Sequence, residues 1–156
     1  MISKINRTNL LVAITMSTVL LGCQTTTVDE RANAEAMEAE VNQQDVLTFF
    51  NWQLKRLNGE NVGKGENGKP LSVKFDTATN KVTGYAGCNN YCGSFSVSET
   101  NLTIGHLAMT RKFCSNTAEL ESRFAKTMTQ VKRFEYLDNE LHLKNSNEET
   151  VAVLAK

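Results

Sequence analysis

Short segments in which apolar and polar residues alternate fill most of the chain after residue 49. Successive side chains of a β-strand point to opposite faces, so this alternation predicts strands with one buried face. The segments lie at residues 50–57, 71–75, 81–86, 93–97, 101–104, 134–136, 141–143 and 151–153. In the first segment the alternation shifts near Arg56. About eight short strands joined by local turns indicate an antiparallel, meander-like sheet.

One segment of the chain has a helical period instead. Its apolar residues recur at spacings of four, four and three, at Leu120, Phe124, Met128 and Val131. This pattern predicts one amphipathic helix between Ala118 and Lys132, with Glu121 outside the apolar face. Asn116, three residues before Glu119, resembles a helix N-cap. The expected fold class is therefore α+β, a curved antiparallel sheet of about eight short strands packed with one α-helix.

The first 22 residues have the features of an export signal. Lys4 and Arg7 precede an apolar stretch from Leu10 to Leu21. That stretch is too short to span a bilayer, which takes roughly 20 residues across about 30 Å of hydrocarbon. It ends in Leu20-Leu21-Gly22-Cys23, which resembles the lipobox of bacterial lipoproteins. We predict a signal peptide over residues 1–22, cleavage before Cys23, and lipids on the Cys23 thiol and the new N-terminus.

Residues 23–48 are expected to form the acylated N-terminus and a tether. From Gln24 to Leu47 they lack glycine, proline and aromatic residues and are rich in Ala and Glu. This composition favours helix but leaves little to bury, so we expect a disordered or weakly helical tether. A coiled-coil helix is the alternative. It is disfavoured because the segment has fewer than three heptads and mostly Ala at the apolar positions. Gln24 follows Cys23, at the position that governs lipoprotein sorting in Gram-negative cells. Resemblance to that sorting implies release to the outer membrane, because inner-membrane retention favours Asp at this position.

Formal charge gives no sign of a nucleic-acid partner. The chain has as many acidic as basic residues. Residues 24–48 are acidic and residues 49–156 are modestly basic, with 14 bases and 11 acids. A field this weak does not attract a polyanion strongly.

Several spaced motifs resemble the META domain family, which is the family of the HslJ-like heat-shock lipoproteins. They are Trp52-Gln53-Leu54, Leu57-Asn58-Gly59, residues 84–90 (GYAGCNN), Gly93-Ser94-Phe95, residues 102–114 (LTIGHLAMTRKFC), Glu119 with the helix, and Leu141-His142-Leu143. The motifs extend over about residues 51–154. We therefore expect a META domain over residues 49–156.

The resemblance implies a small α+β fold, similar in outline to lipid-binding pilot lipoproteins of secretion systems. It implies no established enzymatic activity. Members of the family are associated with envelope stress, antibiotic tolerance and, in some organisms, motility or secretion. These associations identify biological processes but no molecular mechanism. The fold alone does not indicate a mechanism either.

Three thiols remain once Cys23 is acylated, namely Cys88, Cys92 and Cys114. The resemblance implies a disulfide between Cys88 and Cys114, although Cys92 departs from the family pattern. The residues alone leave open a Cys88–Cys92 bond, a Cys92–Cys114 bond, or a buried reduced set. The spacing Cys88-x-x-x-Cys92 does not favour a redox enzyme, which typically has two residues between its thiols.

Other candidate chemistry finds little support in the sequence. Zinc needs about four convergent ligands, and the cysteines with His106 lack paired metal spacing. His142 alternates with buried-type leucines and is expected to face solvent. The glycine-rich segment 63–68 leads to a strand, so we expect a mobile loop and no phosphate-binding loop. Residues 87–90 (GCNN) fit a tight turn, with a binding loop as the alternative.

The sequence therefore predicts a lipid-anchored protein of the cell envelope, in the outer membrane and facing the periplasm. We expect no enzyme activity, no cofactor and no metal. The expected role is a binding or stress-tolerance module that contacts an envelope protein or an apolar ligand, with the concave side of the sheet as the expected binding side. The alternative is a pilot-like assembly factor for secretion or motility. An open apolar cavity would favour a ligand, whereas a closed core with an exposed apolar patch would favour a protein partner.

Overall fold

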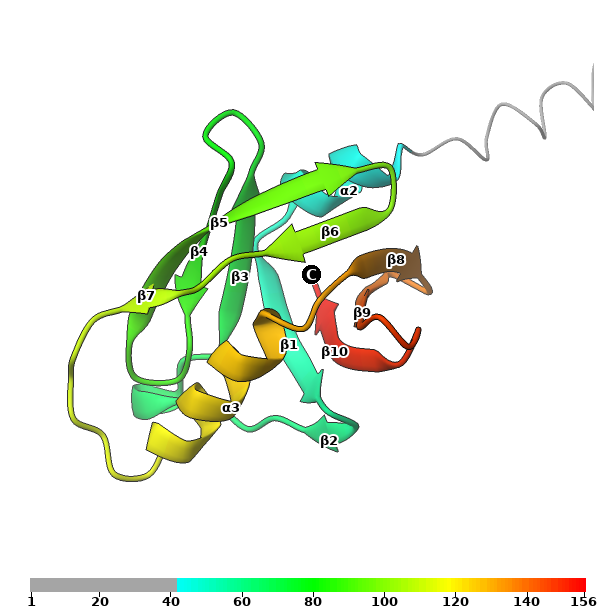
Figure 1. Ribbon diagram of the computed structural model, residues 1–156. Helices are drawn as coiled ribbons and strands as arrows, with labels where there is room; N and C mark the ends of the chain where they lie inside the picture. The colour runs from blue at the N-terminus through cyan, green and yellow to red at the C-terminus, as the bar shows by residue number, and fades with distance from the viewer. Residues whose placement is uncertain (1–41) are drawn as a thin grey trace, which may run out of the picture.

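Ten strands and two α-helices follow one another in the computed structural model, which describes residues 42–156 (Figure 1). The helices are α2 (Gln43–Phe49) and α3 (Ala118–Met128), and a 3-10 turn, η1, covers Glu66–Gly68. The strands are β1 (Trp52–Leu57), β2 (Glu60–Asn61), β3 (Ser72–Asp76), β4 (Lys81–Tyr85), β5 (Asn90–Ser98), β6 (Asn101–Ile104), β7 (Ala108–Met109), β8 (Arg133–Leu137), β9 (Glu140–Lys144) and β10 (Thr150–Ala155). The predicted signal peptide, Cys23 and residues 24–41 of the predicted tether lie outside the described residues.

The strands form one strongly curved antiparallel sheet. Its order is β10-β9-β8-β6-β5-β4-β3-β1-β2, with β7 paired to β5 and an additional pairing between β10 and β1. The sheet therefore curls until its last strand meets its first, while β6 and β8 share a single residue pair, Asn101 with Arg133. The expected α+β class with a curved antiparallel sheet is confirmed. The two strands beyond the expected eight, β2 and β7, have two residues each, which is too short to show alternation.

The shifted alternation in the first strand is a β-bulge. The register of β1 against β10 slips between Leu54 and Arg56. One extra residue on β1 leaves Lys55 and Arg56 both exposed and returns Leu57 to the core. The bulge bends the strand and increases its twist, which helps the sheet to curl.

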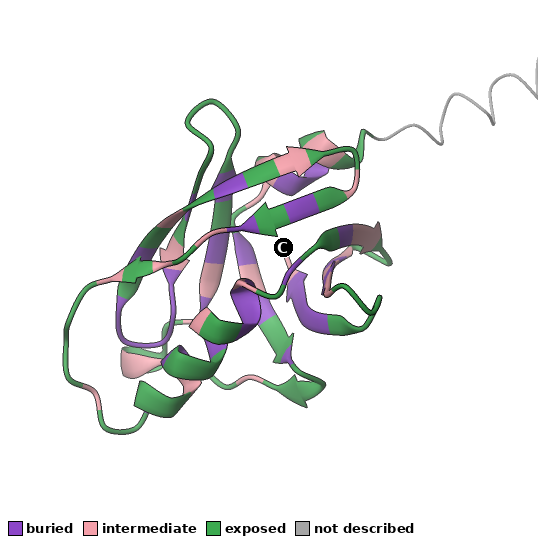
Figure 2. Cartoon of the chain, in the orientation of Figure 1, coloured by how far each residue is buried: buried purple, intermediate pink, exposed green. Residues whose placement is uncertain are grey.

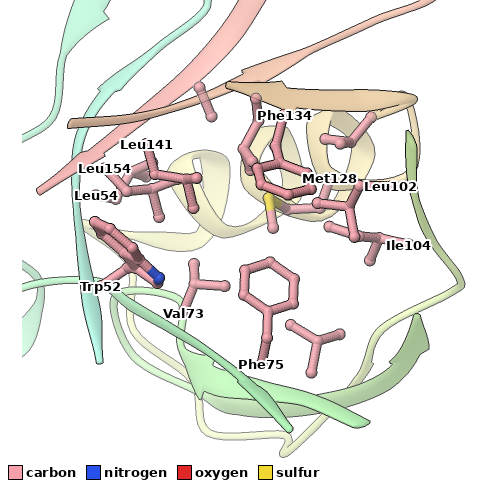
Figure 3. Packing of buried hydrophobic residues seen from close by; sticks show 14 of the residues in the cluster. Trp52, Leu54, Val73, Phe75, Leu102, Ile104, Met128, Phe134, Leu141 and Leu154 are labelled. Atoms are coloured by element: carbon pink, nitrogen blue, oxygen red, sulfur yellow. The ribbon is translucent and has the colours of Figure 1, made fainter. Parts of the chain in front are cut away.

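The concave side of the sheet is filled by its own side chains. The largest fully buried residues include Trp52, Phe75, Phe124 and Phe134. Figure 3 shows side chains from β1, β3, β6, β8, β9, β10 and α3 converging on the same interior. Figure 2 shows the buried positions alternating with exposed ones along the strands. The core is closed, so the structure gives no support to a ligand site inside the sheet.

Helix α3 follows the predicted apolar face and begins at the predicted Ala118, but it ends earlier than predicted and has a different N-cap. Phe124, Met128 and the following Val131 are fully buried, as expected. The helix ends at Met128, because residues 129 and 130 form a turn and the Lys132 N–H then bonds to the Lys144 carbonyl in the sheet. Asn116 is not the N-cap; that position belongs to Thr117, whose side chain makes no capping hydrogen bond. The capping prediction was therefore wrong.

Helix α2 is packed into the domain and begins before the expected boundary at residue 49. The Asn42 side chain caps the helix by accepting a hydrogen bond from the Gln44 N–H at 3.1 Å. Leu47 is fully buried, and its carbonyl accepts a hydrogen bond from Trp52 Nε1 at 2.9 Å. Residues 43–48, expected as part of the tether, thus belong to the folded domain.

Candidate binding surface

The Gly87–Asn90 turn is the centre of the polar contacts at one end of the molecule. Gly87 has φ +125°, a conformation that residues with a Cβ rarely adopt. A Cβ on Gly65 would overlap the backbone of Gly87, so the two segments touch through glycine. The Gly87 carbonyl accepts hydrogen bonds from the Glu66 N–H and the Tyr85 hydroxyl. Gly65 and Glu66, which belong to the segment 63–68 expected as a mobile loop, are therefore held against this turn.

Glu121 joins helix α3 to the same turn. Its carboxylate accepts hydrogen bonds from the backbone N–H groups of Cys88 and Asn89 and from Asn89 Nδ2. The side chain is buried, with 9% of the residue exposed. A buried carboxylate is costly unless it is hydrogen-bonded, and here the turn supplies three donors. The position of Glu121 off the apolar face gave no sign of this role.

Asn89 links the turn to the segment before α3. Its Oδ1 accepts hydrogen bonds from Thr110 Oγ1 at 2.7 Å and from the Lys112 N–H at 2.8 Å, and its Nδ2 donates to the Lys112 carbonyl at 3.2 Å. The buried amide thus fixes the backbone of the segment before α3 at Lys112. The turn interpretation of residues 87–90 is correct, and this turn also positions the neighbouring loop.

A disulfide completes the attachment. Cys88 and Cys114 are joined, with their Cα atoms 6.2 Å apart. This is the pairing that the family resemblance implied. Cys92 is free and exposed on β5, opposite Ala108 of β7. The loop of residues 110–114 is therefore held at one end by Asn89 and at the other by a covalent bond.

Phe113 is exposed on this restrained loop. It is 92% exposed, the most exposed of the large hydrophobic residues in the described chain, and its neighbours Arg111 and Lys112 are also exposed. We call the Gly65–Lys69 turn, the Gly87–Asn90 turn and the Thr110–Cys114 loop together the braced face. Sequence reasoning did not single out Phe113. The available signal in the sequence was an aromatic residue next to two basic residues. Its exposure, however, follows from the attachment of the loop to Asn89 and from the disulfide at Cys114.

Two hollows adjoin the loop. One, of about 330 Å³, is lined by Glu66, Asn67, Lys69, Tyr85, Cys88, Asn90, Lys112 and Cys114. Lys69 Nζ lies 4.5 Å from the centre of the Tyr85 ring in this hollow. Burial, followed by the nearby Glu66 and Glu121 carboxylates, raises the pKa of Tyr85. The second hollow, also about 330 Å³, is lined by residues 90–92 and 108–110, which include Cys92.

The remaining candidate residues do not join this surface. His106 is exposed. His142 lies on the outer side of β9, half-buried, with Nε2 3.8 Å from Glu140 Oε2. Within residues 42–156, no three His, Cys, Asp or Glu side chains are grouped as metal ligands. Burial raises the pKa of Tyr91, whose hydroxyl donates to the Ser72 carbonyl at 2.9 Å. None of these groups forms a catalytic arrangement with another on the described part of the chain.

The fold and this surface define a small curved-sheet domain with a closed core and a restrained loop that carries an exposed aromatic residue. No helix among the described residues has the length and hydropathy needed to cross a membrane. The META domain model matches residues 45–156, and the chain belongs to the META domain family. The match begins within α2, in agreement with the packing of that helix.

Solved structures share the fold. The NMR structure of a protein from Burkholderia xenovorans is 23% identical, with a TM-score of 0.56, covering 71% of this chain and 83% of that one. Another NMR structure is 25% identical, with a TM-score of 0.54, covering 71% of this chain and 92% of that one. A crystal structure of a DUF4847 family protein from Bacteroides vulgatus is 14% identical, with a TM-score of 0.51, covering 72% of this chain and 96% of that one. A search of curated proteins found no significant match.

Proposed function

We propose that this chain is a non-enzymatic binding module, anchored in the outer membrane by lipids on Cys23, whose META domain holds an envelope protein through the braced face. The observation that carries the proposal is Phe113, 92% exposed on a loop fixed by the Cys88–Cys114 disulfide and by Asn89. Stress tolerance is the process that the family resemblance associates with such a module.

The closed core favours a protein partner over an apolar ligand. Trp52, Phe75 and Phe124 occupy the interior in which an apolar ligand would have to bind. The exposed aromatic side chain lies outside, on a loop whose other residues line two surface hollows. Binding energy at protein interfaces concentrates in aromatic and Arg residues, and Phe113 with Arg111 supplies both types.

The attachment of the loop supports the same conclusion. Ordering a flexible loop at an interface costs free energy, and a loop that is already ordered avoids that cost. Asn89 bonds the loop backbone at Lys112, and the disulfide bonds it at Cys114. Phe113 lies between these two attachments.

Anchoring is supported by the sequence pattern of the first 24 residues. The apolar stretch is too short to span the bilayer, and Leu20-Leu21-Gly22-Cys23 provides the modification site. Each buried methylene of an acyl chain contributes about 0.8 kcal/mol, so several chains hold a protein durably at the membrane. Gln24 favours the outer membrane by resemblance to lipoprotein sorting.

A photo-crosslinking amino acid at position 113 of the full-length protein, expressed in its native cells, tests the proposal. We expect a discrete protein adduct from position 113. The matched control is position 49, where Phe49 is 80% exposed at the other end of the domain and should give no such adduct. Absence of a protein adduct at 113, or the same adduct from both positions, would contradict the proposed partner surface.

A further inference from the structure

The described chain begins at α2, at the opposite end of the domain from the braced face. Figure 1 shows α2 at the top right, where the grey trace joins it, and the loop before α3 at the bottom left. Lipid attachment at Cys23 would therefore tether the domain by its α2 end. The surface around α2 is the one that the tether brings nearest to the bilayer.

Aromatic side chains gather at this end. The ring centroids of Phe49 and Phe50 are 4.9 Å apart, those of Phe50 and Trp52 are 5.2 Å apart, and those of Trp52 and Tyr136 are 6.1 Å apart. Trp52 is fully buried, but Phe49 is 80% exposed and Leu137, next to Tyr136, is 50% exposed. The row of rings thus runs from the core to the surface.

The C-terminal residue adds a cation to the cluster. Lys156 Nζ lies 4.6 Å from the centre of the Phe50 ring and 5.4 Å from that of Tyr136. We call Phe49, Phe50, Tyr136 and Lys156 the aromatic patch. Exposed aromatic rings with a long basic side chain are typical of protein surfaces at the membrane–water interface.

We propose that the aromatic patch docks non-covalently on the bilayer, with Phe49 inserted at the level of the lipid headgroups. This inference rests on the proposed lipid attachment at Cys23. Attachment keeps the patch close to the bilayer, which gives it a high effective concentration there. A patch with low intrinsic affinity for lipid is therefore bound to the bilayer. The exposed acids Asp45 and Asp138 lie close to the patch in sequence, so apolar insertion and not charge drives the contact.

Docking gives the domain one orientation. With the aromatic patch on the bilayer, the braced face and Phe113 point away from the membrane, because the two lie at opposite ends (Figure 1). The proposed partner surface is then open to the periplasm. Without docking, the tethered domain would tumble and cover Phe113 part of the time.

Tryptophan quenching by brominated lipids tests the orientation, because the chain has one Trp, the buried Trp52. The chain from Cys23 onward, carrying Cys92→Ser, is coupled through the Cys23 thiol to a maleimide phospholipid in phosphatidylcholine vesicles. Phe49→Trp and Phe113→Trp are compared with the same chain lacking either change. Both substitutions replace exposed aromatic residues, and circular dichroism confirms that each variant is folded.

We expect at least twofold more quenching for Phe49→Trp than for the parent chain, and no increase for Phe113→Trp. No increase at position 49, or equal increases at both positions, would overturn the inference. Chemical coupling makes this result independent of acylation in cells, so failure of the anchor and failure of docking are told apart.

Discussion

Asn89 donates two hydrogen bonds to Glu121, one from its backbone N–H and one from its side-chain amide. The two residues are separated by 32 positions in the sequence, and both are buried. Their contact attaches helix α3 to the turn that restrains the Phe113 loop. The stability of the braced face therefore depends on a carboxylate in the helix.

Removal of this carboxylate should destabilise the domain strongly. Glu121→Ala leaves the Cys88 and Asn89 N–H groups buried without acceptors, at a cost of about 3 kcal/mol in the free energy of unfolding. Glu121→Gln keeps one oxygen acceptor but places an amide donor near Asn89 Nδ2, and should cost about 1 kcal/mol. Urea unfolding of the two variants measures the difference. Equal effects of the two substitutions would contradict the hydrogen-bonding role.

Loss of the disulfide should loosen the loop without unfolding the domain. Cys88 and Cys114 are separated by 26 positions, and closing such a loop stabilises the folded state by about 3 kcal/mol. A Cys88→Ser, Cys114→Ser chain should unfold at lower urea concentration, while amide exchange at residues 110–114 accelerates most. Cys92→Ser is the control and should leave both measurements unchanged. A large effect of Cys92→Ser would indicate a different pairing.

The strand pattern made most of the sheet predictable. Alternation identified eight of the strands, and its shift near Arg56 marked the bulge that the structure shows in β1. The two-residue strands β2 and β7 are defined by their partners on other strands, which local sequence does not specify. The family resemblance supplied the cysteine pairing, which spacing alone left open.

There is a physical reason why the braced face could not be predicted from the sequence. Glu121 lies off the apolar face of an amphipathic helix, and this position predicts a solvent-facing side chain. Its carboxylate is buried because it accepts hydrogen bonds from the Cys88 and Asn89 N–H groups, which are distant in the sequence. Helix α2 was missed because the pair Val46-Leu47 is too short to show a helical period. Its position is set by the contact between Leu47 and Trp52, which forms only in the folded domain.

Helix α2 should contribute to the stability of the domain. Leu47 is fully buried, and replacing it with Ala should lower the free energy of unfolding by about 3 kcal/mol through lost burial and a residual cavity. Thermal unfolding followed by circular dichroism measures the change. Gln43→Ala, at an exposed position of the same helix, is the matched control and should have little effect. A Leu47→Ala chain as stable as wild type would place α2 outside the domain.

Glu135 should make a small, acid-sensitive contribution. Lys144 Nζ lies 2.6 Å from Glu135 Oε2, and its hydrogen bond and charge hold the pKa of Glu135 below the ordinary value of 4.5. A lowered pKa in the folded chain stabilises it above the unfolded pKa, and that contribution is lost as pH falls through the folded pKa. Glu135→Gln should therefore cost about 0.5 kcal/mol at neutral pH, because solvent screens this partly exposed pair.

The pH series on Glu135 uses urea unfolding of wild type and Glu135→Gln at pH 7 and at pH 3. The difference in unfolding free energy should be smaller at pH 3. A difference that stays constant or grows on acidification would show that the Lys144 contact does not lower the pKa of Glu135.

Lipid attachment at Cys23 is the claim on which both proposals about the bilayer and the partner depend. Incorporation of labelled palmitate into wild type and Cys23→Ala, expressed in the same Gram-negative cells, measures it most directly. The account predicts label in the wild-type chain and none in Cys23→Ala, which should also leave the membrane fraction. Equal labelling of the two chains, or no labelling of the wild type, would contradict it.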